Sequence, residues 1–287
     1  MEIVVRDLEV VYQSGTPWMK KALDGVNLTV PGGSFTAILG VTGSGKSTLI
    51  QAIAGLIRPT RGIIRIGSHL IDANRKQTAD VRRLIGLVFQ YPEHQLFAET
   101  VAKDIAFGPT NLGLPQSEVD GRVKQAMEWV GLDSELADRS PFQLSGGQMR
   151  RVAIAGVLAI SPKILILDEP AAGLDPKGQE EILSLLKRLN QDFGVTVILV
   201  SHDMDQAVRY ADRFCVLAEG RSVLSGTAKA VFSRADILSS YHLELPEITR
   251  FVQLLNRKLD PPLPEDVFTL DELERLLEER RKKRELP

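Results

Sequence analysis

The sequence predicts an α/β fold with a mixed-sheet core, an inserted helical subdomain and a C-terminal helical extension. Short, compact apolar runs of the kind that form buried strands alternate with helical patterns at both ends of the chain. Between these parts, residues 91–160 change to a helical pattern, and a proline-containing segment precedes one more helix near the C-terminus. We therefore expect an α/β core from residues 1–90 and 161–232, a helical subdomain from residues 91–160 and an extension from residues 233–287.

The first part of the core predicts strands that lead into a buried helix. Residues 3–11 and 26–30 alternate apolar and polar side chains, and a Pro-Gly-Gly turn at residues 31–33 precedes a short apolar run. That run, residues 35–39, predicts a buried strand, and residues 47–57 are continuous and apolar enough for a buried helix. Further strands are expected at residues 84–89, 164–167 and 195–200, with a closing hairpin from residues 213–218 and 221–224.

Two helices are predicted outside this core. Ser117 is a plausible N-cap, apolar side chains recur at helical spacing from residue 119 to residue 130, and Gly131 follows as a stop signal. In the extension, three prolines between residues 256 and 266 indicate a stiff linker, and Thr269 with Glu272 indicates a capping box. The basic end of that last helix, residues 280–284, favours a solvated surface, with membrane headgroups as the alternative partner.

The composition is that of a globular protein. The chain has 287 residues, 44% of them hydrophobic and 25% charged, which argues against disordered and collagen-like classes. The net charge of −2 gives no sign of a nucleic-acid partner, and a single cysteine fits a reducing, cytoplasmic setting. The N-terminus lacks the pattern of a secretion signal, and no apolar run approaches the about 18 residues of a spanning helix.

The first motif with chemical meaning is GVTGSGKS, from Gly40 to Ser47, which lies between the predicted strand and helix. Glycines let backbone amides curl around phosphate oxygens, and the helix N-terminus adds partial positive charge. Lys46 would reach the β- and γ-phosphates, and the hydroxyl of Ser47 would bind Mg²⁺. This pattern predicts a nucleoside triphosphate site in a P-loop NTPase core. Its expected ATP-binding residues are Gly40, Gly43, Ser44, Gly45, Lys46, Ser47 and Thr48.

Two carboxylates follow the apolar run that ends at Leu167. Because burying an unpaired charge is energetically costly, Asp168 and Glu169 must have a charged or hydrogen-bonding partner, or a chemical role. Asp168 can hold the magnesium shell through water, and Glu169 can accept the proton from an attacking water. The alternative, a strand that ends in a solvated acidic turn, is disfavoured because the same chain carries the phosphate loop.

The third motif is LSGGQ, which precedes a helical run at residues 149–160. Its expected site residues are Ser145, Gly146, Gly147 and Gln148. A hydroxyl and free amides at a second helix N-terminus make a second anion site. Two such sites on one chain indicate either two phosphates or one phosphate shared between chains.

With these motifs the chain resembles the ATP-binding-cassette (ABC) ATPases, because LDEP, GLDP and SHD follow the phosphate loop in that family's order. The resemblance covers about residues 1–232 and implies a head-to-tail dimer, homo- or heteromeric. In it the signature of one subunit closes over ATP held by its partner. It assigns Gln90 to the magnesium and water region, His202 to the γ-phosphate region, Asp175 to the D-loop and Tyr12 to adenine stacking. Taken alone, Gln90 could be a surface amide, and His202 a structural residue.

A narrower resemblance is to the ATPases of energy-coupling-factor (ECF) transporters, closest to the second of their two paired types. The segments that carry it are residues 89–97, 100–109 and 144–159. It implies uptake of vitamins or transition-metal ions, a transmembrane coupling subunit, a substrate-binding membrane subunit, and a peripheral position at the cytoplasmic face. It also implies that residues 90–107 form the groove for the coupling subunit, where Glu93, Glu99 and Asp104 could receive an arginine.

Other classes remain open from the sequence. A P-loop kinase or GTPase has no use for LSGGQ, and soluble ABC proteins of DNA repair or translation commonly carry two cassettes or long insertions. The ATPase of another importer, for example one for amino acids, is the strongest competitor. The sequence does not identify the transported substrate.

Overall fold

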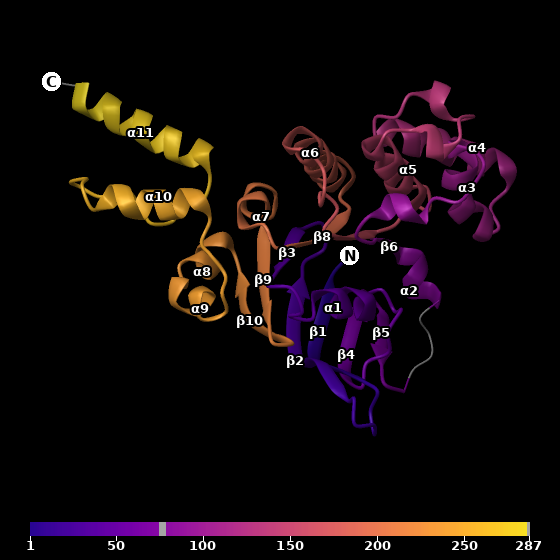
Figure 1. Cartoon of the computed structure of the whole chain (residues 1–287), viewed down its shortest axis with the longest axis horizontal. Coiled ribbons are helices and arrows are strands. Elements are labelled where there is room, and N and C mark those ends of the chain that lie inside the picture. Colours follow the sequence, from indigo (N-terminus) through magenta and orange to yellow (C-terminus); the bar gives the residue numbers. More distant parts are fainter. Residues whose placement is uncertain (75–78, 286–287) are drawn as a thin grey trace.

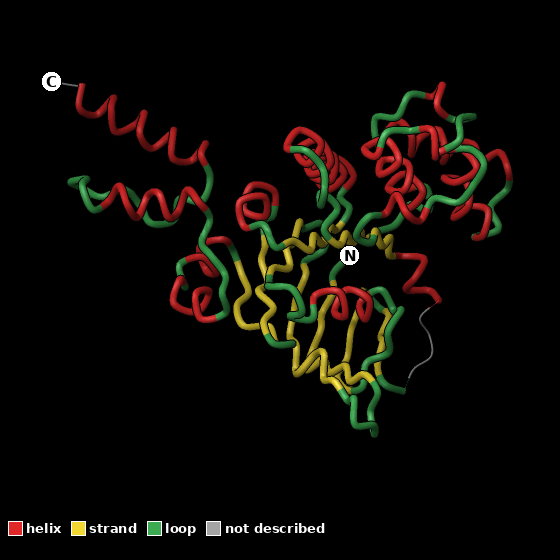
Figure 2. The backbone as a smooth tube through the Cα atoms, in the orientation of Figure 1, coloured by secondary structure: helices red, strands yellow, loops and turns green. Residues whose placement is uncertain are grey.

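The chain folds around two β-sheets with one helix between them. The computed structural model describes residues 1–74 and 79–285. The strands gather at the centre, a helical lobe lies at one end of the long axis, and the C-terminal helices lie at the other (Figures 1 and 2). This arrangement confirms the predicted α/β class with its mixed sheets.

The larger sheet has six strands in the order β10-β9-β3-β8-β7-β6. Neighbouring strands run parallel except for the β9–β10 hairpin. The interior strands β3, β7 and β8 are almost continuously buried, as expected for a parallel sheet covered on both faces. The strands span β3 Phe35–Leu39, β6 Ile85–Val88, β7 Ile164–Asp168, β8 Thr196–Ser201, β9 Arg213–Ala218 and β10 Arg221–Gly226.

The smaller sheet is antiparallel and has the order β2-β1-β4-β5. The sequence predicted the first two strands, although β2 begins six residues earlier than expected. It gave no prediction for β4 and β5, because their short runs alternate too briefly to stand out. The strands span β1 Ile3–Tyr12, β2 Lys20–Val30, β4 Arg61–Ile66 and β5 His69–Asp72.

Helix α1, Lys46–Ile53, lies between the two sheets. Its buried Leu49, Ile50 and Ile53 belong to one core with Ile38 and Ile166 of the six-stranded sheet and with apolar residues of the four-stranded sheet. Burial between the two sheets explains the apolar character of this helix, although Ser47 at its start stays exposed. The same core contains Cys215, whose complete burial raises the pKa of its thiol to about 12.

The other face of the six-stranded sheet carries α6 and the helical lobe. The lobe holds α3 Val101–Asn111, α4 Gln116–Trp129 and α5 Gly146–Leu158. Ser117 is not the N-cap of α4, because the helix begins one residue earlier and follows Pro115. Gly131 has a positive φ of 68°, which fits the predicted stop. The lobe also includes three single-turn helices, η1 Pro92–Gln95, η2 Ser134–Leu136 and η3 Pro141–Gln143.

The remaining helices connect the strands or form the C-terminal part. Helix α6 has a strongly one-sided apolar face, which it buries against the sheet through Leu186 and Leu189. The helices span α2 Ala79–Leu84, α6 Pro176–Phe193, α7 Met204–Tyr210, α8 Ala228–Phe232, α9 Ala235–Ser240, α10 Glu247–Asn256 and α11 Leu270–Glu285.

The C-terminal part is a packed unit. Thr269 and Glu272 form the expected capping box, because Thr269 Oγ1 accepts from the Glu272 amide at 3.3 Å and the Thr269 amide donates to Glu272 Oε2 at 3.1 Å. The predicted stiff linker is not a free spacer. Asn256 bonds both backbone groups of Leu263, and Leu263 joins Val252 of α10 in a small core with α11. Within the described ranges, none of the helices combines the length and the apolar character that a bilayer span requires.

Candidate active site

The phosphate-loop motif lies where the sequence predicts it, between β3 and α1. Gly40 has a φ of 154°, and an added Cβ there would come within 2.2 Å of the Leu217 carbonyl oxygen. Gly45, the N-cap of α1, has a φ of 105°, and its Cβ would meet the Ala22 carbonyl oxygen at 2.7 Å. Both positions therefore require glycine. The loop leaves the first amides of α1 without side-chain caps, so that they remain available to an anion.

Lys46 is folded back against its own loop. Its Nζ donates to the carbonyl oxygens of Gly40 at 2.7 Å and Val41 at 3.0 Å. Burial lowers the pKa of Lys46, while the carboxylates of Glu169 and Asp168 act in the opposite direction. Ser44 Oγ, in the same loop, is buried and has no hydrogen-bond partner among the described residues. A charged donor and an unsatisfied hydroxyl at a helix N-terminus suit an anionic ligand.

Ser47 and Asp168 face one another across the loop. Ser47 Oγ donates to Asp168 Oδ2 at 2.9 Å, although the two residues are 121 positions apart. Burial raises the pKa of Asp168, and the hydrogen bond from Ser47 opposes that shift. Hydroxyl and carboxylate oxygens are hard donors of the kind that Mg²⁺ takes, so this pair fits that ion.

Glu169 contacts two of the other predicted site residues. Its Oε1 lies 3.0 Å from His202 Nδ1, and its Oε2 accepts from Gln90 Nε2 at 3.5 Å, the long limit of a hydrogen bond. Gln90 follows β6, Glu169 follows β7, and His202 follows β8, so neighbouring parallel strands deliver the three side chains to one sheet edge. Within the part of the chain that the structure describes, the side-chain hydrogen bond of Gln90 goes to Glu169 and not to Asp168.

Tyr12 lies at the end of β1, against the start of α1. Its hydroxyl is 3.3 Å from Thr48 Oγ1, and 39% of its surface is exposed. The ring is therefore held beside the phosphate loop with a free face. That position is suitable for stacking on a base.

The LSGGQ segment caps α5. Ser145 Oγ accepts from the Gln148 amide at 3.3 Å, and Gln148 Oε1 accepts from the Ser145 amide at 3.0 Å. An added Cβ at Gly146 or Gly147 would meet no described atom within 4 Å, so the helix end is open. Asp175 caps α6 in the same way, by accepting from the Gly178 amide at 3.0 Å. The two capped helix ends line one cleft.

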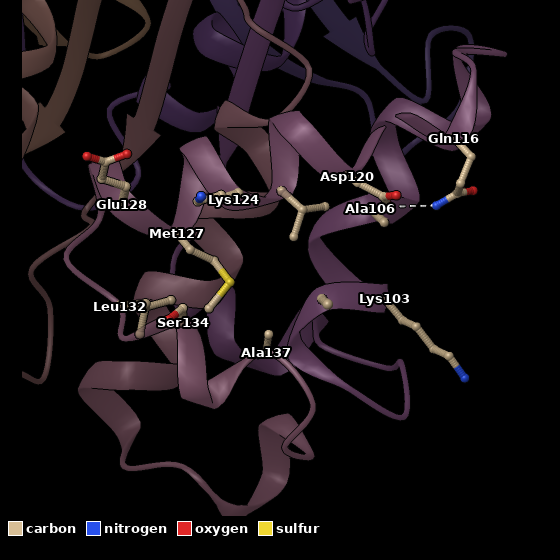
Figure 3. Close-up of a pocket in the computed structure, with 12 residues that line it drawn as sticks. Lys103, Ala106, Gln116, Asp120, Lys124, Met127, Glu128, Leu132, Ser134 and Ala137 are labelled. Carbon is tan, nitrogen blue, oxygen red and sulfur yellow. Dashed lines mark hydrogen bonds between the residues drawn. The ribbon is translucent and has the colours of Figure 1, made fainter. Parts of the chain in front are cut away.

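Six of the predicted residues line two separate cavities, and the phosphate loop lies outside both linings. One, of about 340 Å³, is lined by Gln90, Glu169 and His202, and the other, of about 320 Å³, by Ser145, Gly147 and Asp175. A further cavity of about 770 Å³ lies inside the helical lobe between α3 and α4 (Figure 3). Ala106, Val123 and Met127 contribute to its lining, and none of the predicted site residues does.

The sequence did not predict how the phosphate loop is supported. The β9–β10 turn inserts between β2 and the loop, because the Gly220 amide donates to the Ser44 carbonyl and the Gly220 carbonyl accepts from the Asp24 amide. An added Cβ on Gly220 would come within 2.8 Å of the Ala22 carbonyl oxygen. In the sequence, Gly220 indicated only a hairpin turn. No sequence pattern indicated that this turn lies beside Ser44.

Comparison with known families gives one match to a family pattern. The pattern described as ABC transporter matches residues 23–172. That span includes the phosphate loop, the LSGGQ segment and both carboxylates that follow β7.

Named relatives match nearly the whole chain. The chain is 51% identical to the energy-coupling factor transporter ATP-binding protein EcfA2 of Caldanaerobacter subterraneus subsp. tengcongensis, over 95% of each protein. It is 50% identical to the EcfA2 protein of Clostridium acetobutylicum, over 94% of this chain and 95% of the relative.

Solved structures show the same fold. CbiO1 of Clostridium perfringens, part of the ABC transporter complex CbiONQ, has a TM-score of 0.74 and 42% identity, over 88% of this chain and 98% of that one. The ATP-binding cassette MJ0796, solved as a dimer bound to ADP and Pi after hydrolysis, has a TM-score of 0.70 and 33% identity. That match covers 78% of this chain and 98% of the cassette.

Proposed function

This chain belongs to the ABC transporter family, and we propose that it is the ATP-binding and ATP-hydrolysing subunit of an energy-coupling-factor importer. In this role it powers uptake of vitamins or transition-metal ions through a separate transmembrane coupling subunit and a substrate-binding membrane subunit. The observation that carries the proposal is the presence on one chain of a phosphate loop with uncapped helix amides and of a separate, open signature helix end, combined with about 50% identity to EcfA2 proteins over nearly the full length. A kinase or GTPase needs only the phosphate loop.

Within this proposal the phosphate loop and its surroundings hold ATP. Lys46 exchanges its two loop carbonyls for β- and γ-phosphate oxygens, and the α1 N-terminus supplies amides. Tyr12 stacks on adenine, a contact worth roughly 0.5–1.5 kcal/mol beyond its buried area. Residues 1–90 and 161–232 form the nucleotide-binding core, residues 91–160 the signature subdomain and residues 233–287 the extension.

Ser47 and Asp168 would hold Mg²⁺, with Asp168 acting through water, and Gln90 is the third proposed ligand. The ion, when bound, neutralises charge on the phosphates. Burial alone would favour a neutral Asp168, whereas the neighbouring hydroxyl and Lys46 favour the charged carboxylate that such a ligand needs.

Hydrolysis is assigned to the cluster around Glu169. Its carboxylate accepts a proton from the attacking water, and the 3.0 Å contact with His202 fixes the direction of that carboxylate. Gln90 donates to the other carboxylate oxygen of Glu169, and its proposed role is to orient the water. His202 lines the same cavity and is the proposed contact to the γ-phosphate.

The second cleft serves a partner's ATP. Gly146 and Gly147 leave open space at the start of α5, Ser145 and Gln148 hold this helix end through their capping box, and Asp175 lies beside them at the proposed dimer seam. Closing two subunits head to tail completes both ATP sites. Exposed apolar side chains on α10 and α11, Phe251, Leu254, Leu270 and Leu277, support a contribution of the extension to dimer contacts.

Residues 90–107 are the proposed contact surface for the coupling subunit. In this arrangement the chain is a peripheral subunit at the cytoplasmic face of the membrane. Phe97 and Phe107 form an exposed edge-to-face pair there, with ring centres 4.8 Å apart. The expectation that Glu93 is free to receive an arginine is wrong, because Arg150 of the same chain already holds both of its oxygens. Asp104 Oδ2 accepts from two backbone amides, so Glu99 is the most accessible of the three acids.

Removal of the exposed aromatic pair tests this surface. The double variant Phe97→Ser/Phe107→Ser is expected to lose most co-purification with the coupling subunit, since apolar contact at the centre of an interface supplies much of the binding energy. Its nucleotide affinity should stay unchanged. Phe193→Ser removes a comparably exposed ring, paired with Trp129 at 5.1 Å, and is the matched control. Undiminished co-purification of the double variant would remove the surface from the proposal.

The function itself is tested by reconstitution. The chain, its paired ATPase and the coupling and substrate-binding subunits are placed in proteoliposomes, and uptake of labelled vitamins, cobalt and nickel is measured. Uptake is expected with ATP on the side of this subunit and not with a non-hydrolysable analogue. ATP-driven uptake of an amino acid instead, with none of these substrates transported, would favour the competing importer class.

A further inference from the structure

Arg150 is a buried charge inside the signature helix that none of the predicted motif roles uses. It lies in the second turn of α5, five residues after Ser145, and only 2% of its surface is exposed. A guanidinium buried to this extent must have its donors satisfied, or it would destabilise the fold. Its partners come from two different segments of the site.

The first partner is Glu93, in the single-turn helix η1. Arg150 Nε donates to Glu93 Oε2 at 3.0 Å, and Nη2 donates to Glu93 Oε1 at 2.7 Å, so the pair is bidentate. The side chains are 3% and 14% exposed. Burial acts to raise the pKa of Glu93, but the hydrogen bonds from Arg150 and from the backbone leave it below its ordinary value. Glu93 follows Gln90 by three residues, so the pair holds the chain that carries Gln90.

The second partner is the chain immediately after Glu169. Arg150 Nη1 donates to the carbonyl oxygens of Pro170 at 3.0 Å and Ala172 at 2.8 Å. This is the turn in which Glu169 has a φ of 48°, a backbone conformation that is strained for a residue with a side chain. The Ala172 amide closes the same turn on the Glu169 carbonyl at 3.1 Å. Arg150 therefore stabilises the turn that aims the Glu169 carboxylate.

We propose that Arg150 is a positioning residue for ATP hydrolysis, which fixes Gln90 and Glu169 relative to one another through its bonds to Glu93 and to the Pro170–Ala172 turn. The inference rests on the proposed roles of Gln90 and Glu169. The 3.5 Å separation of their side-chain atoms leaves little margin, and a displacement of about 1 Å can cost about 100-fold in rate. Because Arg150 belongs to the signature helix, a movement of that helix also moves both residues.

Only arginine fits this place. The guanidinium is planar and offers donors in two directions, which allows it to grip a carboxylate on one side and two carbonyls on the other. A lysine keeps the charge but cannot make both sets of bonds from one nitrogen. Arg150→Lys therefore separates the charge of this residue from its geometry.

The test compares Arg150→Lys, Glu93→Gln and the double variant, each paired in the assembled transporter with a hydrolysis-deficient second ATPase. Arg150→Lys is expected to lower kcat about 10- to 100-fold while the Kd for a fluorescent ATP analogue stays within twofold of the wild type. Glu93→Gln should have a smaller effect of the same kind. The double variant should be no slower than Arg150→Lys, because both changes break one bridge.

Arg122→Lys is the matched control. Arg122 also joins a carboxylate, Glu118, to a backbone carbonyl, that of Ala159, but it lies on α4 and these partners belong to neither the Gln90 segment nor the Glu169 turn. Its kcat should stay within twofold of the wild type. All variants are assayed below their unfolding temperatures, measured by circular dichroism, and Glu93→Gln provides a test if Arg150→Lys does not fold.

Three results would overturn the inference: an unchanged kcat, an equal loss of kcat and nucleotide affinity, or an equal loss of kcat in the Arg122→Lys control. The result for Glu169→Gln separates this inference from the proposed function. If that variant loses turnover and Arg150→Lys does not, the hydrolytic assignment stands and the positioning role fails. If Glu169→Gln keeps turnover, the proposed function itself fails at this site.

Discussion

Glu169→Gln is expected to keep ATP binding and to lose most ATP turnover in the assembled complex. General-base removal typically costs a factor of about 10² to 10⁴ in rate, because water is no longer deprotonated as it attacks. The glutamine keeps the shape of the side chain, so the contacts to Gln90 and His202 change in charge rather than in size. Phosphate contacts come from the loop at residues 40–48 and should not change.

The measurement is single-site turnover beside equilibrium binding of ATP. Glu180→Gln is the control, since Glu180 lies exposed on α6 and pairs with Arg209 on the surface. It should leave both quantities unchanged. Near wild-type hydrolysis by Glu169→Gln in the complex would show that another group is the base.

The second large effect is expected from Lys46→Met. Loss of a partly buried ammonium beside the phosphates should weaken ATP binding by roughly 2–4 kcal/mol, a factor of about 30 to 1,000 in Kd. The long apolar side chain of methionine can fill the same space, although it leaves the Gly40 and Val41 carbonyls without their donor. Binding is measured by titration calorimetry on the purified chain.

The shared site can be tested with two single variants, Lys46→Met in one chain and Ser145→Arg in another, which are then mixed. Arginine at residue 145 blocks the open signature end and should abolish hydrolysis while ATP still binds to the same chain. If one chain completes the site of another, mixed dimers of the two variants contain one intact site and recover up to half of the wild-type activity. Unmixed variants give the baseline. Mixed dimers that form by light scattering but remain inactive would contradict sharing between copies of this chain.

The phosphate loop shows how much of the site a local pattern can predict. Gly40, Gly45 and Lys46 act through backbone angles and close contacts within a few residues, and these needs are written in the residue types themselves. The capping box of Thr269 and Glu272 is equally local. Both elements occur in the structure at the predicted places for that reason.

Other features depend on distant parts of the chain. The strands β4 and β5 carry too short an apolar pattern to be recognised, and they become strands because β4 pairs with β1 and β5 pairs with β4. The predicted linker at residues 256–266 packs instead of extending. Asn256 donates to the Leu263 carbonyl oxygen, and the Leu263 side chain packs in an apolar core. Glu93 was expected to face a partner subunit, and its own Arg150 occupies it.

The sequence alone predicted the candidate chemistry of this protein: a phosphate loop, two carboxylates after a strand, and a helix end proposed to bind a second anion. These are short-range properties, fixed by residue type and spacing. The tertiary structure alone decided which of these groups meet. Parallel strands bring Gln90, Glu169 and His202 to one sheet edge, the signature faces a separate cleft, and Arg150 ties the signature helix to the catalytic turn. Contacts between residues far apart in the chain depend on how whole elements pack, and no local pattern encodes that packing.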